Sequence, residues 1–268
     1  MLDQKYRKLK DILMEMESVV VAFSGGVDST FLLRVAKDVL GTENVLALTA
    51  TSPTYPEYEL EESRQLATEM KVRQLEIESD ELKIPGFANN ERNRCYHCKK
   101  ELFTLCREKA KELGFAFILD GSNLDDLDDI RPGRKAIEEL EIRSPLLEAE
   151  LTKNDIRLLS RDLNLSTWNK QPFACLSSRF PFGTEITSER LIQVGRCETV
   201  LRHHRVRNYR VRYHNETARI EVAPDEIEKF IDEEFRKEIV AEFKAAGFTY
   251  VALDLEGYRT GSMNEVHP

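Results

Sequence analysis

The sequence has no apolar run close to the ~20 residues that a membrane-spanning helix needs, which argues against an integral membrane protein. Residues 1–10 are polar and charged and do not have the pattern of a secretory signal, so we expect a cytoplasmic protein. The sequence also has no internal repeat and no low-complexity tract. These absences leave a globular protein of ordinary composition, whose 41% hydrophobic content is ample for a core.

The chain has few cysteines, five among 268 residues, and their number is odd. An odd count without a secretory signal argues against a disulfide scaffold and for thiol or metal chemistry. The net charge of −9 argues against a nucleic acid partner bound over the whole surface. Eight arginines nevertheless gather between residues 190 and 219, so a local basic segment exists.

The most informative stretch is residues 24–29, Ser-Gly-Gly-Val-Asp-Ser, which follow the apolar run 19–23. Two glycines let the backbone approach an anion, the hydroxyls of Ser24 and Ser29 add donors, and a following helix directs free N–H groups at phosphate. The segment lacks the lysine of a GxxxxGK[ST] loop and the spacing of a GxGxxG fingerprint. It therefore predicts a different kind of nucleotide triphosphate site, the alternative being an ordinary strand-to-helix turn capped by Asp28.

Strand and helix patterns alternate through the first half of the chain, as in an α/β protein with a parallel sheet. We expect strands at 19–23, 44–51, 72–77, 115–119 and 165–168, and helices at 2–16, 30–40, 57–70 and 98–113. This layout is doubly wound, and ligands in such sheets lie at the carboxyl ends of the strands. Thr49 and the turn 120–123 should therefore border the nucleotide site together with residues 24–29.

The pattern changes after residues 182–183, where a Pro-Phe-Gly punctuation precedes a capped helix that starts near residue 187. We place a domain boundary there, which gives an α/β domain over 1–183 and a small α+β domain over 184–268. In the second domain we expect a hairpin of strands 209–213 and 217–222, helices over 224–246 and a strand at 249–254.

Cys95 and Cys98 form a CxxC pair, which we expect in a loop that leads into a helix. The spacing suits two ligands of one metal centre, but it also fits a redox pair, or a zinc site completed by residues such as His97. Cys175 lies in a loop of small residues after the expected last strand. Two other cysteines lie in helical patterns and are expected to be small buried hydrophobes: Cys106 and Cys197.

Residues 24–29 resemble the PP-loop of ATP pyrophosphatases, which bind ATP and transfer AMP to a substrate oxygen. Further motifs are RCYHCK at 94–99, GSNLDDLDDIRPG at 121–133, ACLSSRFPFG at 174–183, and RVR, ARIEV and DLEGYRTGSMN in the second domain. Together they resemble the LarE family over essentially the whole chain. The resemblance implies a PP-loop, Rossmann-type (adenine nucleotide α-hydrolase-like) fold, a homo-oligomer, and an adenylating, ATP-dependent sulfurtransferase of nickel-pincer nucleotide biosynthesis. Its small-molecule substrate would be pyridinium biscarboxylic acid mononucleotide, whose carboxylates become thiocarboxylates.

The cysteine set separates two chemistries within this family. In one, the residue that matches Cys175 attacks the adenylated carboxylate and gives up its own sulfur. The other resembles PP-loop enzymes that hold a 4Fe-4S cluster by a CxxC and one distant cysteine. Cys95, Cys98 and Cys175 match the latter, which implies a cluster whose open fourth iron carries sulfide from an external sulfur donor.

Other interpretations remain open at this point. They are a zinc site or unliganded CxxC beside a sacrificial Cys175, a tRNA uridine thiolase favoured by the basic segment 190–219, and a non-enzymatic nucleotide sensor. The single CxxC and the absence of a recognisable RNA module argue against the tRNA enzyme.

The remaining site residues follow from the residue types and the family match. Asp28 is the preferred carboxylate for Mg²⁺, and Asp125 and Asp126 are weaker candidates. Together with Asp128 and Asp129, these two residues also fit a solvated acidic turn. Besides Cys175, the expected catalytic residues are Asp28 and Arg179, the latter to neutralise a substrate carboxylate or AMP. The expected nucleotide-binding and phosphate-binding residues are Ala22, Ser24, Gly25, Gly26, Val27, Asp28, Ser29, Thr49, Gly121, Arg210, Arg212 and Arg259.

In some members of the family, three carboxylates of the second domain bind a divalent metal. Glu198 and Glu221 match two of them, and Lys229 stands where the third would be expected. Surface charge on a helix or strand is the alternative role for both glutamates.

Overall fold

The computed structural model describes residues 2–127, 133–171, 174–259 and 262–264. The expected turn residues Asp128 and Asp129 therefore lie outside the described residues. The chain divides into two compact units: unit 1 comprises Met1–Glu81 and Asn93–Phe173, and unit 2 comprises Leu82–Arg92 and Ala174–Pro268. Within the described ranges, every helix is too short or too polar to cross a lipid bilayer.

Unit 1 is built on a parallel four-stranded sheet with strand order β3-β2-β1-β4. The strands are β1 (Val19–Ala22), β2 (Val45–Thr51), β3 (Arg73–Glu78) and β4 (Phe117–Leu119). The chain passes from β1 to β2 and β3 on one side, and then crosses to β4 on the other side of β1. The carboxyl ends of β1 and β4 therefore form the switch point at which such sheets bind ligands.

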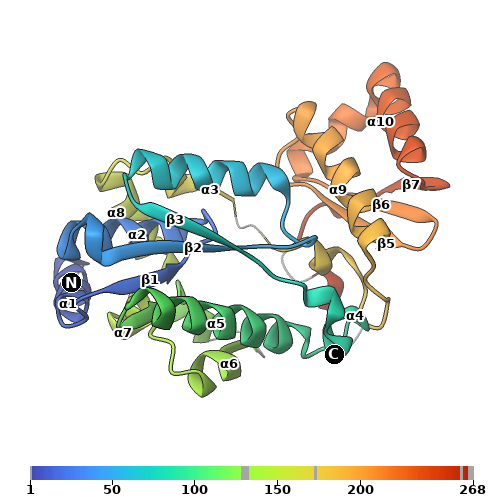
Figure 1. Ribbon diagram of the computed structural model, residues 1–268. Coiled ribbons are helices and arrows are strands. Elements are labelled where there is room, and N and C mark those ends of the chain that lie inside the picture. The colour runs from blue at the N-terminus through green and yellow to red at the C-terminus, as the bar shows by residue number, and fades with distance from the viewer. Residues whose placement is uncertain (1, 128–132, 172–173, 260–261, 265–268) are drawn as a thin grey trace. The chain divides into compact units, whose positions relative to one another are not determined.

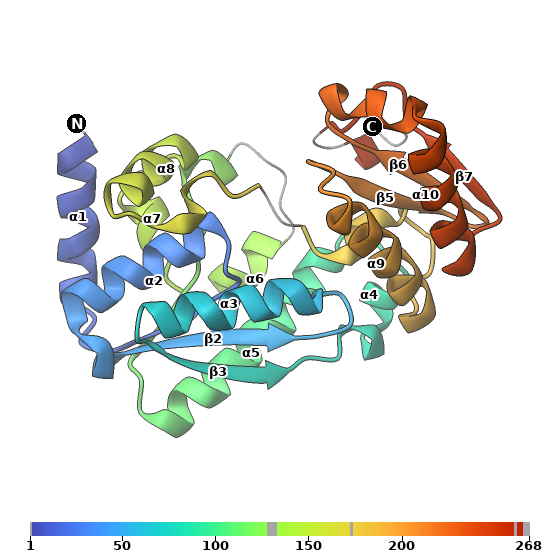
Figure 2. The same ribbon diagram turned by 90° about the horizontal axis from the view of Figure 1, so that it is seen from above.

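Helices cover both faces of this sheet (Figure 1). Alternate residues of β1 point to opposite faces, so each face of the strand packs in its own core. Val19 and Val21 pack in a core with α1 (Leu2–Met14), α2 (Val27–Leu40), α3 (Glu57–Glu69), α7 (Pro145–Glu148) and α8 (Lys153–Asp162). Val20 packs in the opposite core with α5 (Arg94–Leu113) and α6 (Gly133–Glu139). Figure 2 shows α8 beside α2 on the first face. The predicted doubly wound α/β fold is confirmed.

Two local predictions are wrong. Residues 166–169 form a 3-10 helix (Ser166–Asn169) and not a strand of the sheet. Asn164 has a φ of 57° and the amide of Leu165 bonds back to the carbonyl of Ser160, so the chain folds onto the end of α8. Cys95 and Cys98 lie in the first turn of α5, which begins at Arg94, and not in a loop before it.

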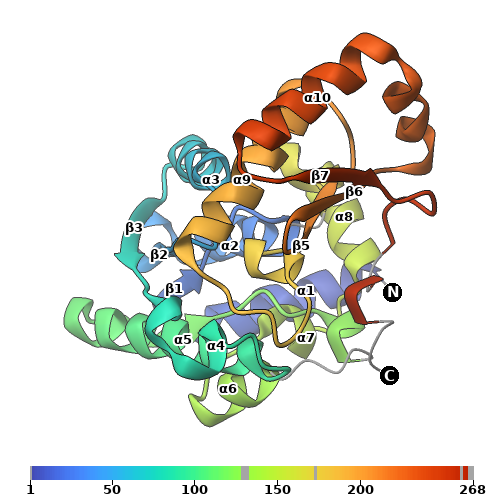
Figure 3. The same cartoon turned by 90° about the vertical axis from the view of Figure 1, so that its right-hand side faces the viewer.

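Unit 2 contains a small three-stranded sheet with order β5-β6-β7 (Figure 3). The strands β5 (Arg210–His214) and β6 (Thr217–Glu221) form the predicted hairpin, and β7 (Tyr250–Leu253) runs parallel to β6. The helices α9 (Ser188–His203) and α10 (Glu233–Ala245) contact each other and the sheet, and a 3-10 helix, Pro224–Ile231, precedes α10. A small C-terminal domain is therefore confirmed.

A short segment from the first half of the chain belongs to unit 2. It contains α4 (Pro85–Ala88) and is tied by backbone hydrogen bonds from Ile186 to Ala88, at 2.8 Å, and from Gly183 to Asn90, at 3.0 Å. The side chain of Asn90 also donates its Nδ2 to the carbonyl of Pro181 at 2.7 Å. Unit 2 thus combines two stretches that lie far apart in the sequence.

Candidate functional site

Residues 24–29, the phosphate loop, lead from the end of β1 into the first turn of α2 at the switch point of the sheet. Gly25 has a φ of 65°, and a Cβ at this position would lie 3.2 Å from the Cβ of Ser63 on α3, so conformation and space both require glycine. Gly26 is the N-cap of α2 and has no side chain with which to accept from the first turn. The N–H groups at the start of α2 can therefore bind an anion in the loop.

Asp28, in the first turn of α2, is held from two sides. Asn123, in the turn after β4, donates its Nδ2 to Oδ1 of Asp28 at 3.3 Å, and Nζ of Lys153 contacts Oδ2. Gly121 lets this turn approach, because a Cβ there would lie 3.3 Å from the amide nitrogen of Ser29. The structure thus brings Asp28, Gly121 and Asn123 together at the switch point, as the sequence predicts.

Lys153 was not identified from the sequence, because it lies 125 residues from Asp28 and no motif marks it. Lys170 is a second unpredicted cation at the loop. Its side chain is only 14% exposed, and its Nζ donates to the carbonyl of Gly25 at 3.2 Å and pairs with Glu59 at 2.7 Å and Glu62 at 3.0 Å. Lys170 therefore fixes the backbone of the loop against α3.

Other residues of the expected nucleotide site hold the loop in place. The hydroxyl of Thr49 is buried and donates to the carbonyl of Phe23 at 2.8 Å, which ties β2 to the segment after β1. The hydroxyls of Ser24 and Ser29 lie 3.3 Å apart across the loop. Ala22 ends β1 beside the loop, whereas the side chain of Val27 is buried in the core. Val27 can therefore serve a nucleotide only through its backbone.

The acidic turn after β4 caps backbone groups. Asp125 accepts from the amide of Lys153 at 2.9 Å, and Asp126 accepts from the amide of Asn123 at 3.0 Å. Asp28 is therefore the carboxylate of this group that lies in the phosphate loop itself, which favours it as the Mg²⁺ ligand.

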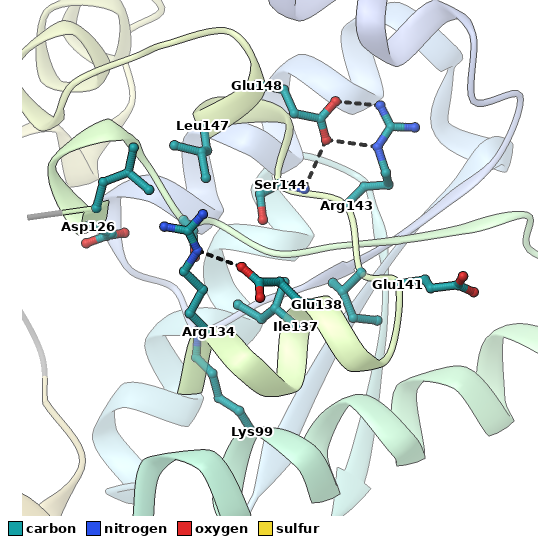
Figure 4. Close-up of a pocket in the computed structure, with 13 residues that line it drawn as sticks. Lys99, Asp126, Arg134, Ile137, Glu138, Glu141, Arg143, Ser144, Leu147 and Glu148 are labelled. Carbon is teal, nitrogen blue, oxygen red and sulfur yellow. Dashed lines mark hydrogen bonds and ion pairs between the residues drawn. The ribbon is translucent and has the colours of Figure 1, made fainter. Parts of the chain in front are cut away.

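A pocket of about 410 Å³ in unit 1 borders the same turn, with Ser122 and Asp126 among its lining residues (Figure 4). Its cationic side chains have acidic partners: Arg143 pairs with Glu148, through bonds of 2.8 and 2.5 Å, and Arg134 pairs with Glu138 at 3.0 Å. The pocket provides space for a small molecule next to the turn that carries Gly121.

The CxxC pair lies at the amino end of α5, where residues three apart share one side of the helix. Cys95 is exposed, and Cys98 is half-buried and donates its thiol to Oε1 of Glu81 at 3.3 Å. Burial raises the pKa of the Glu81 carboxyl, against the hydrogen bonds that lower it. Two thiols on one helix turn fit two ligands of a single iron–sulfur cluster, because soft thiolate donors suit iron.

Cys175 belongs to unit 2, so the three-cysteine set stays a prediction. Cys175 is the N-cap of the 3-10 helix Leu176–Arg179, and its Sγ lies 2.8 Å from Oγ of Ser177. The described part of the chain contains no group of three or more His, Cys, Asp or Glu side chains that could hold a metal ion. As predicted, Cys106 and Cys197 are buried, and burial raises the pKa of each thiol to about 12.

Arg179 is buried behind the Cys175 loop, with 1% of its side chain exposed. It binds Glu198 through two hydrogen bonds, Nε to Oε1 at 2.7 Å and Nη2 to Oε2 at 2.9 Å. Its Nη1 donates to the carbonyl of Ala174 and to Oγ of Ser178, both at 2.8 Å. In this arrangement Arg179 fixes the loop that carries Cys175, and Glu198 is its counterion.

The arginines of β5 differ in their surroundings. Arg212 is buried and donates Nε and Nη2 to Oε2 of Glu221 at 2.9 and 2.6 Å. Arg210 is half-buried, with its guanidinium 5.1 Å from the ring centroid of Tyr258. Burial, and then the charge of the neighbouring Arg179, lower the pKa of Arg210. Arg210 and Arg212 lie two residues apart and so share one face of β5, as the sequence predicts.

The carboxylates expected at a second-domain metal site are engaged by cations. Glu198 pairs with Arg179, and Glu221 pairs with Arg212 and with Arg219 at 3.0 Å. Lys229, at the expected third position, pairs with a different carboxylate, Glu226, at 2.6 Å. Arg259 pairs with Glu256 at 3.0 Å. The two matched glutamates therefore act as internal counterions in this unit.

The chain is similar to a protein family over its first part and to individual proteins over most of its length. The family profile described as NAD synthase matches residues 3–111. A pyridinium-3,5-bisthiocarboxylic acid mononucleotide synthase of Lactiplantibacillus plantarum is 39% identical over 253 residues, which are 94% of this chain and 91% of that protein. Uncharacterized proteins of Synechocystis sp. and Methanocaldococcus jannaschii are 42% and 32% identical, over 99% and 96% of this chain and 99% and 98% of theirs.

Proposed function

Because the chain belongs to the LarE family of PP-loop proteins, we propose that it is an ATP-dependent sulfur transferase that acts on pyridinium-3,5-biscarboxylic acid mononucleotide. The product would be the corresponding thiocarboxylate. The observation that carries the proposal is the phosphate loop at the switch point, with Asp28 inside it, in a chain that is similar to a bisthiocarboxylic acid mononucleotide synthase over 94% of its length.

In the first step, the loop at 24–29 and the amino end of α2 would hold the phosphates of ATP, with Mg²⁺ at Asp28. A carboxylate oxygen of the substrate bonds to the α-phosphorus of ATP. The bond between this phosphorus and the oxygen that bridges it to the β-phosphate breaks. Pyrophosphate leaves with the electron pair. The rigid backbone at Gly25, held by Lys170, keeps the loop in the conformation that this step needs.

In the second step, a sulfide sulfur bonds to the acyl carbon and AMP leaves with the electrons of the broken carbon–oxygen bond. Cys95, Cys98 and Cys175 would hold a 4Fe-4S cluster, which supplies an iron with an open position for sulfide. Arg179 and Glu198 would keep the Cys175 loop in its position. Thiolate ligands need a reducing compartment, so the proposal includes a cytoplasmic location.

Arg210 is proposed to bind the phosphate of the substrate, because its guanidinium is half-buried and stands over Tyr258. Arg212 would position Arg210 rather than bind the phosphate itself, since Arg212 is buried and its Nε and Nη2 are bound to Glu221. An Arg210→Lys variant should raise the KM for the mononucleotide and leave the KM for ATP unchanged. Equal KM values for the mononucleotide in both proteins would overturn this assignment.

The proposed reaction is tested by incubating anaerobic protein with Mg-ATP, sulfide and the pyridinium mononucleotide. We expect pyrophosphate release that depends on the mononucleotide, and a thiocarboxylate in the mass spectrum of the product. Pyrophosphate release that depends on tRNA and not on the mononucleotide would contradict the proposal and favour the tRNA thiolase.

The cluster is tested by the iron and acid-labile sulfide content of anaerobically purified protein. We expect about four irons per chain, lost in Cys95→Ala, Cys98→Ala and Cys175→Ala variants. A buried-thiol variant, Cys106→Ala, is the matched control and should keep its iron. Iron-free, zinc-bearing protein would contradict the cluster and return Cys175 to the role of a sacrificial sulfur donor.

A further inference from the structure

The hydroxyl of Ser177 contacts the sulfur of Cys175 inside unit 2. Its Oγ lies 2.8 Å from Sγ of Cys175, within hydrogen-bond reach. Ser177 is completely buried, with 0% of its surface exposed, so water does not compete for its hydroxyl. Among the described residues, Sγ of Cys175 is the partner of this hydroxyl. A buried hydroxyl that loses its hydrogen bond costs free energy, so the contact is a defined feature of the loop.

The backbone on both sides of Cys175 is fixed. The amide of Ser178 donates to the carbonyl of Cys175 at 3.0 Å, and Nη1 of Arg179 donates to the carbonyl of Ala174 at 2.8 Å. With the backbone held, the direction of Sγ depends on one torsion, χ1 of Cys175, which has three staggered minima. The hydrogen bond with Ser177 selects one of these minima.

The chemistry of Cys175 determines which atom donates in this hydrogen bond. In a protonated thiol, either Sγ or Oγ could be the donor. A sulfur that binds iron, or that attacks an acyl carbon as a thiolate, carries no proton. In both of these roles of Cys175, the hydroxyl of Ser177 must therefore donate and the sulfur must accept.

A hydroxyl partner is not a general feature of the thiols of this chain. Cys106 and Cys197 are buried, and within the described ranges neither thiol makes a hydrogen bond. Cys98 has a carboxylate as its partner, since it donates to Oε1 of Glu81 at 3.3 Å. The hydroxyl of Ser177 therefore distinguishes the half-buried Cys175 from the structural cysteines.

We infer that Ser177 is a positioning residue for sulfur transfer: its hydroxyl donates to the sulfur of Cys175, holds this sulfur in one rotamer and takes up part of its negative charge. The inference rests on the proposed role of Cys175 in that reaction, as an iron ligand or as the sulfur donor. Hydrogen bonds to the sulfurs of an iron–sulfur cluster stabilise the reduced, more negative state and raise the reduction potential. Removal of the hydroxyl should therefore lower this potential.

The test compares the reduction potential of anaerobically purified wild type and a Ser177→Ala variant, in a reductive titration followed by electron paramagnetic resonance. We expect the variant to keep about four irons and its reduction equilibrium constant to fall about tenfold, as for the loss of one hydrogen bond, which is about 59 mV for one electron. Ser160→Ala is the matched control, because Ser160 is equally buried and its hydroxyl has no hydrogen-bond partner in the described part of the chain. An unchanged potential in Ser177→Ala, or an equal shift in Ser160→Ala, would overturn the inference.

A second measurement decides where either protein lacks iron. Raman spectroscopy of the metal-free protein records the S–H stretching band, and subtraction of the spectrum of the matching Cys175→Ala protein isolates the band of Cys175. The frequency of this band depends on the hydrogen bonding of the thiol, so it should shift in Ser177→Ala and stay constant in Ser160→Ala. Both serine variants should keep the wild-type circular dichroism. A Cys175 band at the wild-type frequency in Ser177→Ala would overturn the inference.

The outcome for Ser177 is separable from the proposed function. If the wild type holds no iron, but the Cys175 band shifts in Ser177→Ala, the cluster fails and the inference stands with Cys175 as the sulfur donor. If no thiocarboxylate forms, but the potential falls in Ser177→Ala, the proposed reaction fails and the positioning of the sulfur stands. If the wild type forms thiocarboxylate with a full cluster and Ser177→Ala keeps the wild-type potential, the inference fails and the function stands.

Discussion

Replacing Glu198 by alanine is expected to destabilise unit 2 strongly. The Arg179–Glu198 pair is almost completely buried, with 1% and 2% of the side chains exposed, and it makes two hydrogen bonds of 2.7 and 2.9 Å. Removing one partner of such a pair leaves an uncompensated buried charge, which costs about 3–5 kcal/mol. Oε1 of Glu198 also accepts from the amide of Val211 at 3.0 Å, so this donor loses its partner as well.

The assay is urea denaturation followed by far-UV circular dichroism. With a slope of about 2 kcal/mol/M, a loss of 3–5 kcal/mol lowers the midpoint by about 1.5–2.5 M. The single tryptophan lies in unit 1, at position 168, so its fluorescence reports on unit 1 separately.

Two further variants make the experiment decisive. An Arg179→Met/Glu198→Leu double variant removes both charges and should recover much of the lost stability, because apolar pairs of similar volume often replace buried ion pairs. Glu150→Ala breaks an exposed pair with Lys8, and it should leave the midpoint unchanged. A shift of the midpoint below about 0.5 M in Glu198→Ala would mean that Glu198 is not a structural counterion of Arg179.

Three further predictions concern the phosphate loop and acid stability. Gly25→Ala should weaken ATP binding, measured by calorimetry, at least about tenfold, because it adds backbone strain and a contact at 3.2 Å. Gly41→Ala is the control: Gly41 also has a positive φ but lies in open space, so the affinity for ATP should not change. Lys170→Met should cost about 3–5 kcal/mol by tryptophan fluorescence in urea, and a cost below about 1 kcal/mol would contradict its role at the loop. Burial raises the pKa of Glu198, but Arg179 outweighs this effect and holds the pKa below its ordinary value. The pair's contribution to stability is therefore present at neutral pH and lost as the pH falls through the lowered pKa. As the pH is lowered from about 7 to about 3, the urea midpoint of the Arg179→Met/Glu198→Leu variant should fall less steeply than that of the wild type. Parallel curves of midpoint against pH would contradict this prediction.

Features that depend on neighbouring residues could be predicted from the sequence. The apolar run of β1, the glycines at 25 and 26 and the helix pattern after them determine the phosphate loop locally, and the alternation of strands and helices indicates the parallel sheet. The approach of Gly121 to Ser29 followed from the rule that parallel strands end at one edge.

Contacts between distant residues could not be predicted in this way. The pairs Lys153–Asp28 and Lys170–Gly25 join residues 125 and 145 positions apart, and lysine on a helix or in a loop is more often solvated than paired. The composition also gives no indication that residues 82–92 join the C-terminal part of the chain in unit 2. The burial of Arg179 against Glu198 requires the fold of unit 2, since hydrophilic side chains with no apolar pattern give no indication of burial.

Catalytic sulfur transfer to the pyridinium mononucleotide can be measured by counting the thiocarboxylates formed per chain, with Mg-ATP and sulfide in excess. Mass spectrometry of the intact protein after the reaction completes the measurement. We expect several thiocarboxylates per chain and an unchanged protein mass. One thiocarboxylate per chain, with the loss of one H₂S from the protein, would contradict the catalytic mechanism, and no thiocarboxylate at all would contradict the function.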